Sequence, residues 1–367
     1  MISLTSQIGR PAGLLFRLLL ALVLLIGAKG AFAQSCSGGG GTYTISLPTS
    51  VAVPRDTPAG TRITSWTYTA SYTNFYYNCS GSNVFIGDAA RPVNFASLGK
   101  TWTESGKTYG LYDSGIPGVG IALAYSQYAG GCGWFGGLVP VTTAGTKVGG
   151  SNWPPSGWTG GSCGSNGSFG GWSVGAQLGA ALVTTGPVSP GVTQSGQILD
   201  LAAYGSSNGS PWLLGNAHQS IVLTSTSVSS IACTTPDVSV PLGTHKTTEL
   251  TGVNTFTAAV SFNLNLNNCP AGMNTVQYRV DPTTTVLNSS QSVVALDASS
   301  GASGIGVQLL NGAGAVFPLS TYQTYSGYSK STGGSYSIAF KARYYQTGAT
   351  VGAGAANTSM TVTLLYQ

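Results

Sequence analysis

The sequence predicts an all-β protein built from two β-sandwich domains. Only 6% of its residues are charged whereas Gly occurs 54 times, a composition that suits strands and turns and lacks the Glu and Lys that favour helices. In the last ten residues, Met360, Val362, Leu364 and Tyr366 alternate with mostly polar residues, which is typical of a half-buried strand. The length of 367 residues exceeds what one sandwich needs, so we expect two domains.

The first 33 residues are expected to be removed. Arg10 and Arg17 precede the apolar run 18–28, and the small-residue site at Ala31 and Ala33 follows it. This pattern predicts a secretory signal peptide over residues 1–33, with an uncleaved anchor as the alternative. The rest of the sequence has no second apolar stretch of membrane length, so we expect an exported protein without a membrane span.

The charge balance argues against nucleic acid or an anionic membrane as a partner. The chain has 14 Lys and Arg residues against 9 Asp and Glu, and Arg10, Arg17 and Lys29 belong to the predicted signal peptide, so the remainder has eleven basic and nine acidic residues (14 − 3 = 11). A formal excess of two spread over such a length does not make a basic patch.

The cysteines indicate disulfides and help to place a domain boundary. An even set of six in an exported chain favours disulfides over metal sites, and although fifteen pairings are formally possible, we expect sequential pairing. A polar stretch at residues 225–232 precedes the last pair, which predicts domains at 34–231 and 232–367. The expected pairs are Cys36 with Cys79, Cys132 with Cys163, and Cys233 with Cys269.

Strand-like runs fill the first predicted domain and are separated by Gly, Pro and Asn turns, which predicts a β-sandwich. They cover residues 42–47, 63–72, 119–125, 174–183, 198–204 and 220–224. All seven Trp residues lie in this domain, so the two domains are expected to do different work: Trp66, Trp102, Trp134, Trp153, Trp158, Trp172 and Trp212.

The second predicted domain shows clearer alternation. Apolar residues recur at every second position in 238–242, in 260–266 and in 338–344. Strands with one buried face and one solvent-exposed face predict an antiparallel sandwich.

Several ordered motifs in the second domain resemble the pilin domain of chaperone–usher fimbriae. They are Cys233 with Val-Pro-Leu-Gly at 240–243, the run Phe262-Asn-Leu-Asn-Leu-Asn-Asn-Cys269, residues 301–309, residues 340–347, and Gly352-Ala-Gly-Ala-Ala-Asn357. The resemblance implies an incomplete immunoglobulin-like sandwich that lacks its last strand. A periplasmic chaperone would fill the resulting groove first, and a donor strand of the next pilus subunit would replace it after export through an outer-membrane usher.

The resemblance also gives the C-terminus a role. Subunits of this family carry a penultimate aromatic residue and a glycine fourteen residues from the end, positions held here by Tyr366 and Gly354. It implies that Gly354, Met360, Val362, Leu364 and Tyr366 border the donor-strand groove. The alternative is an ordinary last strand of a complete sandwich, because any half-buried strand alternates.

The two-domain plan resembles the tip adhesins of type 1-like fimbriae. Cys36 tethers the predicted mature start, so we expect a subunit that accepts a strand without donating one and that lies at the fimbrium tip. The family analogy implies a jelly-roll or immunoglobulin-like receptor-binding domain at 34–231, with a host or surface glycan as its ligand. The alternative is a structural tip or adaptor subunit whose first domain binds a protein receptor or nothing.

The candidate ligand residues come from two places. The Gly-rich segment 130–172 contains Trp134, Asn152, Trp153 and Trp158, and sugar rings stack on such aromatic faces while amide and carboxylate groups take the hydroxyls. The family analogy adds three residues near the first cysteine pair. A role of the Trp residues as core or loop anchors is the plainer interpretation. The three further candidates are Gln34, Asn83 and Asp88.

Enzyme and metal sites are not expected. Gly160-Gly-Ser-Cys-Gly164 fits the pattern of a nucleophile elbow, but glycine loop is predicted on both sides instead of a strand and a helix. Carboxylates for glycoside hydrolysis would have to come from scattered Asp and Glu residues. Only His218 and His245 could supply imidazole, so we predict no catalytic residue, cofactor or metal.

Overall fold

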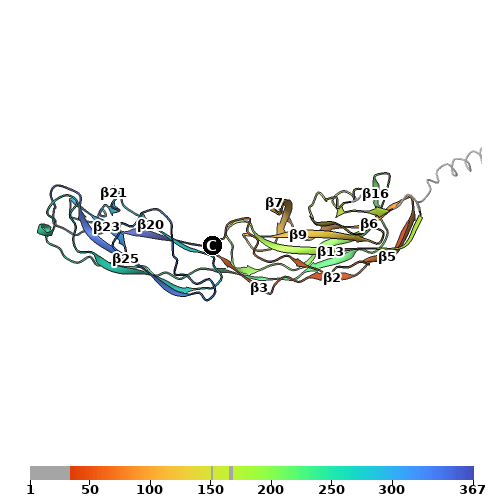
Figure 1. Ribbon diagram of the computed structural model, residues 1–367, viewed down its shortest axis with the longest axis horizontal. Helices are drawn as coiled ribbons and strands as arrows, with labels where there is room; N and C mark the ends of the chain where they lie inside the picture. Colours follow the sequence, from red (N-terminus) through yellow and green to blue (C-terminus); the bar gives the residue numbers. More distant parts are fainter. Residues whose placement is uncertain (1–33, 150–151, 165–167) are drawn as a thin grey trace, which may run out of the picture.

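The computed structural model describes residues 34–149, 152–164 and 168–367, so the predicted signal peptide lies outside the described residues. Figure 1 shows an elongated molecule in which two β-structured units lie end to end, with the C-terminus at their junction. We call residues 34–231 the N-terminal unit and residues 232–367 the C-terminal unit, and keep this division as a proposal. No strand ladder among the described residues joins the two units.

The larger sheet of the N-terminal unit has eight strands centred on the antiparallel pair β13–β9. Its strand order is β1-β5-β13-β9-β8-β7, with β10 beside β9 and β4 beside β13. The strands are β1 (Ser35–Gly38), β4 (Thr67–Tyr68), β5 (Tyr76–Ser82), β7 (Ser97–Glu104), β8 (Lys107–Asp113), β9 (Val119–Ala129), β10 (Gly133–Pro140) and β13 (Ser168–Thr184).

A second sheet of seven strands packs against the first, and a small sheet of three strands extends toward the junction. The seven-stranded sheet contains β2 (Thr42–Ile45), β6 (Phe85–Pro92), β11 (Thr159–Gly160), β12 (Cys163–Gly164), β15 (Gly196–Ser207), β16 (Ser210–Leu213) and β17 (Gln219–Leu223). The small sheet contains β3 (Ser50–Pro54), β14 (Gly191–Val192) and β18 (Ser227–Ile231).

The core of the N-terminal unit lies between its two large sheets. Ile121 and Leu123 of β9 and Leu178 of β13 are fully buried and share one apolar cluster with Ile86 of β6 and Leu201 of β15. Burial of such side chains stabilises the fold by roughly 1.5–3 kcal/mol each. The cluster therefore joins the sheets into a sandwich, as the sequence predicted.

The C-terminal unit consists of a five-stranded and a three-stranded antiparallel sheet. Their order is β19-β25-β23-β22-β21 and β24-β20-β26. A separate apolar cluster containing Leu266, Met273 and Tyr366 lies between them. The strands are β19 (Val260–Cys269), β20 (Val276–Pro282), β21 (Val286–Asn288), β22 (Val293–Val294), β23 (Ile305–Asn311), β24 (Gln323–Thr324), β25 (Gly334–Gln346) and β26 (Met360–Tyr366).

The prediction of an all-β chain is confirmed. The only helical element in the described part of the chain is a single 3-10 turn, η1 (Thr247–Glu249). The three expected disulfides, Cys36–Cys79, Cys132–Cys163 and Cys233–Cys269, are also confirmed. Within the described residues there is no helix with the length and apolar character of a membrane span, and no cluster of potential metal ligands.

Two of the predicted strands do not form regular strands in the structure. In 63–72 only Thr67–Tyr68 pairs as a ladder, because the hydroxyls of Thr64 and Thr69 accept the N–H groups of Leu182 and Leu178 in place of backbone carbonyls. The run 238–242 forms no strand although its apolar residues alternate, and its surroundings give the reason below.

Candidate functional site

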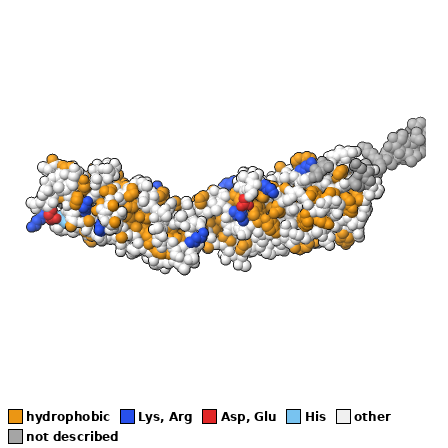
Figure 2. Space-filling view, in the orientation of Figure 1, with side chains coloured by type: hydrophobic (Ala, Val, Ile, Leu, Met, Phe, Trp, Pro, Cys, Tyr) orange, Lys and Arg blue, Asp and Glu red, His pale blue; other side chains and the backbone are white. Residues whose placement is uncertain are grey.

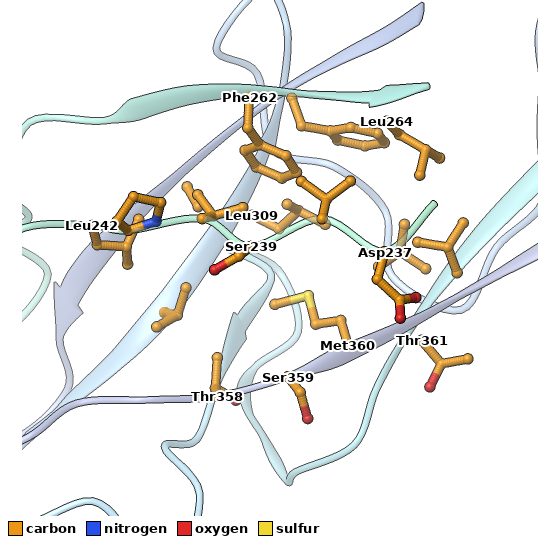
Figure 3. Close-up of a pocket in the computed structure, with 18 of the residues that line it drawn as sticks. Asp237, Ser239, Leu242, Phe262, Leu264, Leu309, Thr358, Ser359, Met360 and Thr361 are labelled. Carbon is orange, nitrogen blue, oxygen red and sulfur yellow. The ribbon is translucent and has the colours of Figure 1, made fainter. Parts of the chain in front are cut away.

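A long groove runs along the C-terminal unit between residues 235–243 and the free edge of β26, and we call it the β26 groove. Its volume is about 1150 Å³. Figure 3 shows Phe262, Leu264 and Leu309 on one side of it, with Met360 extending into it from β26. The groove is thus bounded by two extended segments whose backbones do not pair with each other.

The floor of the β26 groove is apolar. It is formed by side chains of β19, β23 and β25, among them Phe262, Leu264, Leu309 and Phe340. The rings of Phe262 and Phe340 stack with centroids 5.6 Å apart, and Phe340 also packs edge-on against Phe317. A floor of this kind favours apolar side chains of an incoming segment.

The walls of the groove leave apolar side chains exposed to solvent. Val238 on one wall is 38% exposed and Val362 on the other is 37% exposed. After the bridge between Thr234 and Asn267, no described residue pairs with 235–243 as a strand, and Pro236 and Pro241 have no N–H to offer. The alternating run at 238–242 is therefore extended chain beside an open groove, which explains the missing strand.

One edge of β26 is paired and the other faces the groove. Backbone groups of Gln367 and Ser359 bond to Thr275 and Thr283, which directly precede and follow β20. Backbone groups of an antiparallel strand point alternately to its two edges, so those of Met360, Val362, Leu364 and Tyr366 point away from β20. At Met360, at Val362 and at the N–H of Leu364, these donors and acceptors have no partner among the described residues, which makes this part of the edge a ready template for another strand.

The predicted groove residues divide into three groups. Met360, Val362 and Leu364 line the β26 groove. Tyr366 is fully buried in the C-terminal core, with its hydroxyl 3.4 Å from the carbonyl oxygen of Cys233. Gly354 lies past the end of the groove beside a smaller cavity of about 320 Å³, where a Cβ would come within 2.3 Å of the Gly301 backbone.

Sequence reasoning missed the other contributors to the groove. The wall 235–243 was predicted as an ordinary strand, and Arg55 of the N-terminal unit was not considered although it lines one end. The proline pair at 236 and 241 was the available signal for the wall. No local signal could have pointed to Arg55.

Three of the predicted ligand residues of the N-terminal unit are accessible. Trp153 is 60% exposed and Trp134 is 42% exposed, with its ring edge-on to Tyr128. Asn83 occupies the turn between β5 and β6 with a left-handed φ of 55°, a conformation that Asn tolerates well. No hydrogen bond or ring contact among the described residues joins these three side chains to one another.

Trp158 is a packing residue. It is buried in a cluster with Ala89, Ala202 and Tyr204 on the outer face of the second sheet. The Arg91 guanidinium lies 4.7 Å from its ring centre, and His218 meets the ring edge-on at 5.7 Å. Asp200 bonds both of these neighbours, at 3.0 Å to Arg91 and 2.9 Å to His218. Trp158 therefore presents no open face to a ligand.

Asp88 lies inside the sandwich. The Tyr125 hydroxyl donates to its carboxylate at 2.6 Å, and Gln127 donates to its backbone carbonyl at 3.2 Å. Burial of the carboxyl group raises the pKa of Asp88 to about 7, against the opposing effect of these hydrogen bonds. The side chain links the two sheets and is out of reach of a ligand on the surface.

The remaining two candidates are also held by the fold. The Gln34 side chain donates to the carbonyl of Phe85 at 3.0 Å and packs over Gly205, where a side chain with a Cβ would clash with it. Asn152 is buried. The structure thus separates the seven candidates into an accessible group of Asn83, Trp134 and Trp153 and a buried or packed group of Gln34, Asp88, Asn152 and Trp158.

The segment 160–164 has no nucleophile-elbow geometry. Ser162 is buried between the two-residue strands β11 and β12, and Cys163 is bonded to Cys132. A strand follows this segment at β13, whereas the elbow requires a helix.

Comparison with known proteins identifies the family. The model of the family described as fimbrial protein matches residues 221–367. The chain is 33% identical over 133 residues to the type-1 fimbrial protein A chain of Escherichia coli (strain K12), covering 36% of this chain and 72% of that protein. It is 34% identical over 133 residues to fimbrial subunit type 1 of Klebsiella pneumoniae, with the same two shares of 36% and 72%.

This chain therefore belongs to the fimbrial protein family, as its C-terminal motifs suggested. Among solved structures, it is similar to the CupB6 tip adhesin from Pseudomonas aeruginosa, with a TM-score of 0.37 and 15% identity, over 91% of this chain and 94% of that one.

Proposed function

We propose that this protein is a tip adhesin of a chaperone–usher fimbria. Its C-terminal unit joins the fibre by accepting a donor strand in the β26 groove, and its N-terminal unit binds a surface carbohydrate. A periplasmic chaperone, an outer-membrane usher and the next pilus subunit are the assembly partners, and the site of action is the fimbrium tip outside the cell.

The observation that carries the assembly part is the unpaired edge of β26 above an apolar floor. The side chains of Val238 and Val362 on the groove walls expose apolar surface to water, which is unfavourable. An extended segment with alternating apolar residues would pair its backbone with the edge of β26 and cover Phe262 and Leu309 with alternate side chains. The groove lies within the region that matches the fimbrial family.

Amide hydrogen exchange with a designed peptide tests strand acceptance. The probe is a peptide of about ten residues with Val or Ile at alternate positions, long enough to span the groove at roughly 3.3 Å per residue. Added to the full chain, it is expected to slow exchange at the N–H groups of Val362 and Leu364. A control peptide of the same composition without the alternation should not do so. Unchanged exchange with the alternating peptide at saturating concentration overturns the assembly proposal.

The adhesion part rests on the accessible tryptophans of the N-terminal unit. Trp134 and Trp153 expose large aromatic faces in a Gly-rich region, and exposed aromatic faces suit stacking on the C–H faces of sugars. Figure 2 shows few charged side chains on the visible face of the molecule, which suits a neutral ligand better than a strongly charged one.

A glycan array with the full chain, stabilised by the donor peptide, tests this part. Trp153→Ala or Trp134→Ala is expected to weaken sugar binding by about tenfold, the loss of roughly one good stacking contact. Phe256→Ala is the matched control, since Phe256 is a comparably exposed aromatic residue of the other unit. Full binding by both Trp variants contradicts the proposed stacking. A silent array together with tight binding to a protein receptor favours the adaptor alternative.

A further inference from the structure

The N-terminal unit reaches the free edge of β26 through two consecutive residues. Arg55 and Asp56 follow β3, and the backbone N–H of Arg55 bonds to the carbonyl of Ile231, which places both at the junction of the units. The Arg55 guanidinium donates to the carbonyl oxygen of Leu364 at 2.7 Å. The backbone N–H of Tyr366 donates to Oδ2 of Asp56 at 3.0 Å.

These two bonds reproduce what a neighbouring strand would supply. A strand beside β26 would donate an N–H to the Leu364 carbonyl and accept the N–H of Tyr366. Arg55 and Asp56 do both with side chains, and they are paired with each other at 3.0 Å. The Arg55 guanidinium also lies 4.9 Å from the ring centre of Tyr366, so the pair is held against the strand on a second side.

We infer that the Arg55–Asp56 pair is a side-chain cap that ends the strand-accepting edge of β26 at Leu364. The inference rests on the proposed function, because it concerns the same groove. An inserted strand pairs with Met360, Val362 and the N–H of Leu364 and then meets the Arg55 guanidinium, which lines this end of the groove. The cap therefore fixes how far the partner's strand extends and hence its register.

The cap also makes the N-terminal unit part of the assembly site. A segment that displaces Arg55 and Asp56 must break bonds that tie the two units together at this edge. A partner strand of the right length leaves these bonds intact.

Two donor peptides of different length test the cap on the full chain. The shorter ends opposite Leu364, and the longer has two more residues that would reach Tyr366. The unaltered protein is expected to bind both with similar affinity. The double variant Arg55→Ala with Asp56→Ala should bind the longer peptide about tenfold more tightly, since the carbonyl of Leu364 and the N–H of Tyr366 both become available. Asp56→Ala alone frees only the N–H of Tyr366 and should gain about threefold. Arg62→Ala is the control, because Arg62 forms an ion pair of similar exposure with Glu104 in the N-terminal unit and neither residue lines the β26 groove.

Hydrogen exchange at Tyr366 gives a second readout that needs no peptide. Asp56→Ala is expected to speed exchange of the Tyr366 amide by about tenfold, the loss of one charge-assisted bond, while the Leu365 amide on the β20 side is unchanged. Three results would overturn the cap. The longer peptide binds the unaltered protein more tightly than the shorter one does, the ratio of the two affinities is the same in all variants, or the exchange rate of the Tyr366 amide is unchanged in Asp56→Ala. Failure of both peptides to bind any variant instead overturns the strand-accepting groove itself.

Discussion

The backbone N–H of Tyr366 donates a 3.0 Å hydrogen bond to the carboxylate of Asp56, a residue 310 positions earlier in the chain. Tyr366 is at the same time fully buried in the C-terminal core. β26 is therefore tied along one edge to β20 of its own unit and at its end to the other unit. Substitutions on β26 are expected to have very different effects at neighbouring positions of the same face.

Tyr366→Ala should destabilise the C-terminal unit by about 3–5 kcal/mol, because it empties a fully buried aromatic site. Val362→Ala should cost less than about 1 kcal/mol in the donor-free chain, because Val362 lies in the open groove. Hydrogen exchange of peptides from β19 and β25 measures both. A large loss of protection from Val362→Ala would contradict the open groove, and the same variant should weaken donor-peptide binding.

Tryptophan fluorescence reports on the N-terminal unit alone, since all seven Trp residues lie there. In urea unfolding followed by this signal, Trp158→Ala should lower the free energy of unfolding by about 3–5 kcal/mol, because Trp158 is buried between Arg91 and His218. Trp153→Ala should change it by no more than about 0.5 kcal/mol. Similar losses for both variants would argue against this division. If the two variants differ as expected, Trp153→Ala can serve as a clean probe of ligand binding and Trp158→Ala cannot.

Asp88 should make the stability of the N-terminal unit depend on pH. Burial raises the pKa of Asp88 to about 7 from an ordinary 3.8, so the folded state holds a proton that the unfolded state releases first. The stabilisation by the protonated carboxyl group is complete below about pH 4, falls as the pH rises toward about 7 and is lost above that. The total loss of unfolding free energy approaches about 1.4 kcal/mol for each unit by which the pKa of Asp88 differs between the folded and unfolded states.

Urea unfolding at pH values from about 4 to 8 measures this dependence. Asp88→Asn should remove most of the decline, because the amide does not ionise. Asp113→Asn is a control, since Asp113 is only half-buried and caps a turn by accepting the N–H of Gly115. An unaltered decline in the Asp88 variant would rule out Asp88 as its source.

Removal of the Cys233–Cys269 disulfide should loosen one wall of the β26 groove. The bond joins Cys233, two residues before the wall at 235–243, to Cys269 at the end of β19 across a sequence separation of 36. Replacing both cysteines by Ser should destabilise the C-terminal unit by about 2–4 kcal/mol and weaken donor-peptide binding. Hydrogen exchange of 235–243 and peptide titration measure the two effects. The same change at Cys132 and Cys163, in the other unit, should leave peptide binding unchanged.

Much of this fold could be predicted from the sequence because its determinants are local. Alternation over 260–266 and 338–344 predicts β19 and β25, since successive side chains of a strand face opposite sides. The even cysteine set in an exported chain predicts disulfides, and the C-terminal motifs predict the fimbrial family. Strand prediction failed where a side chain or an absent neighbour replaced the ladder, as at Thr64, Thr69 and 238–242.

The chain by itself thus determined an all-β protein with three sequential disulfides and a fimbrial C-terminal region, because residue periodicity and short motifs encode these features. Only the tertiary structure decided which tryptophans are covered, since burial depends on which sheet face or loop lies above a ring. It also decided that Arg55 and Asp56 meet the end of β26. Residues so far apart in the chain come together only through the packing of whole units, and a local sequence pattern cannot predict such a contact.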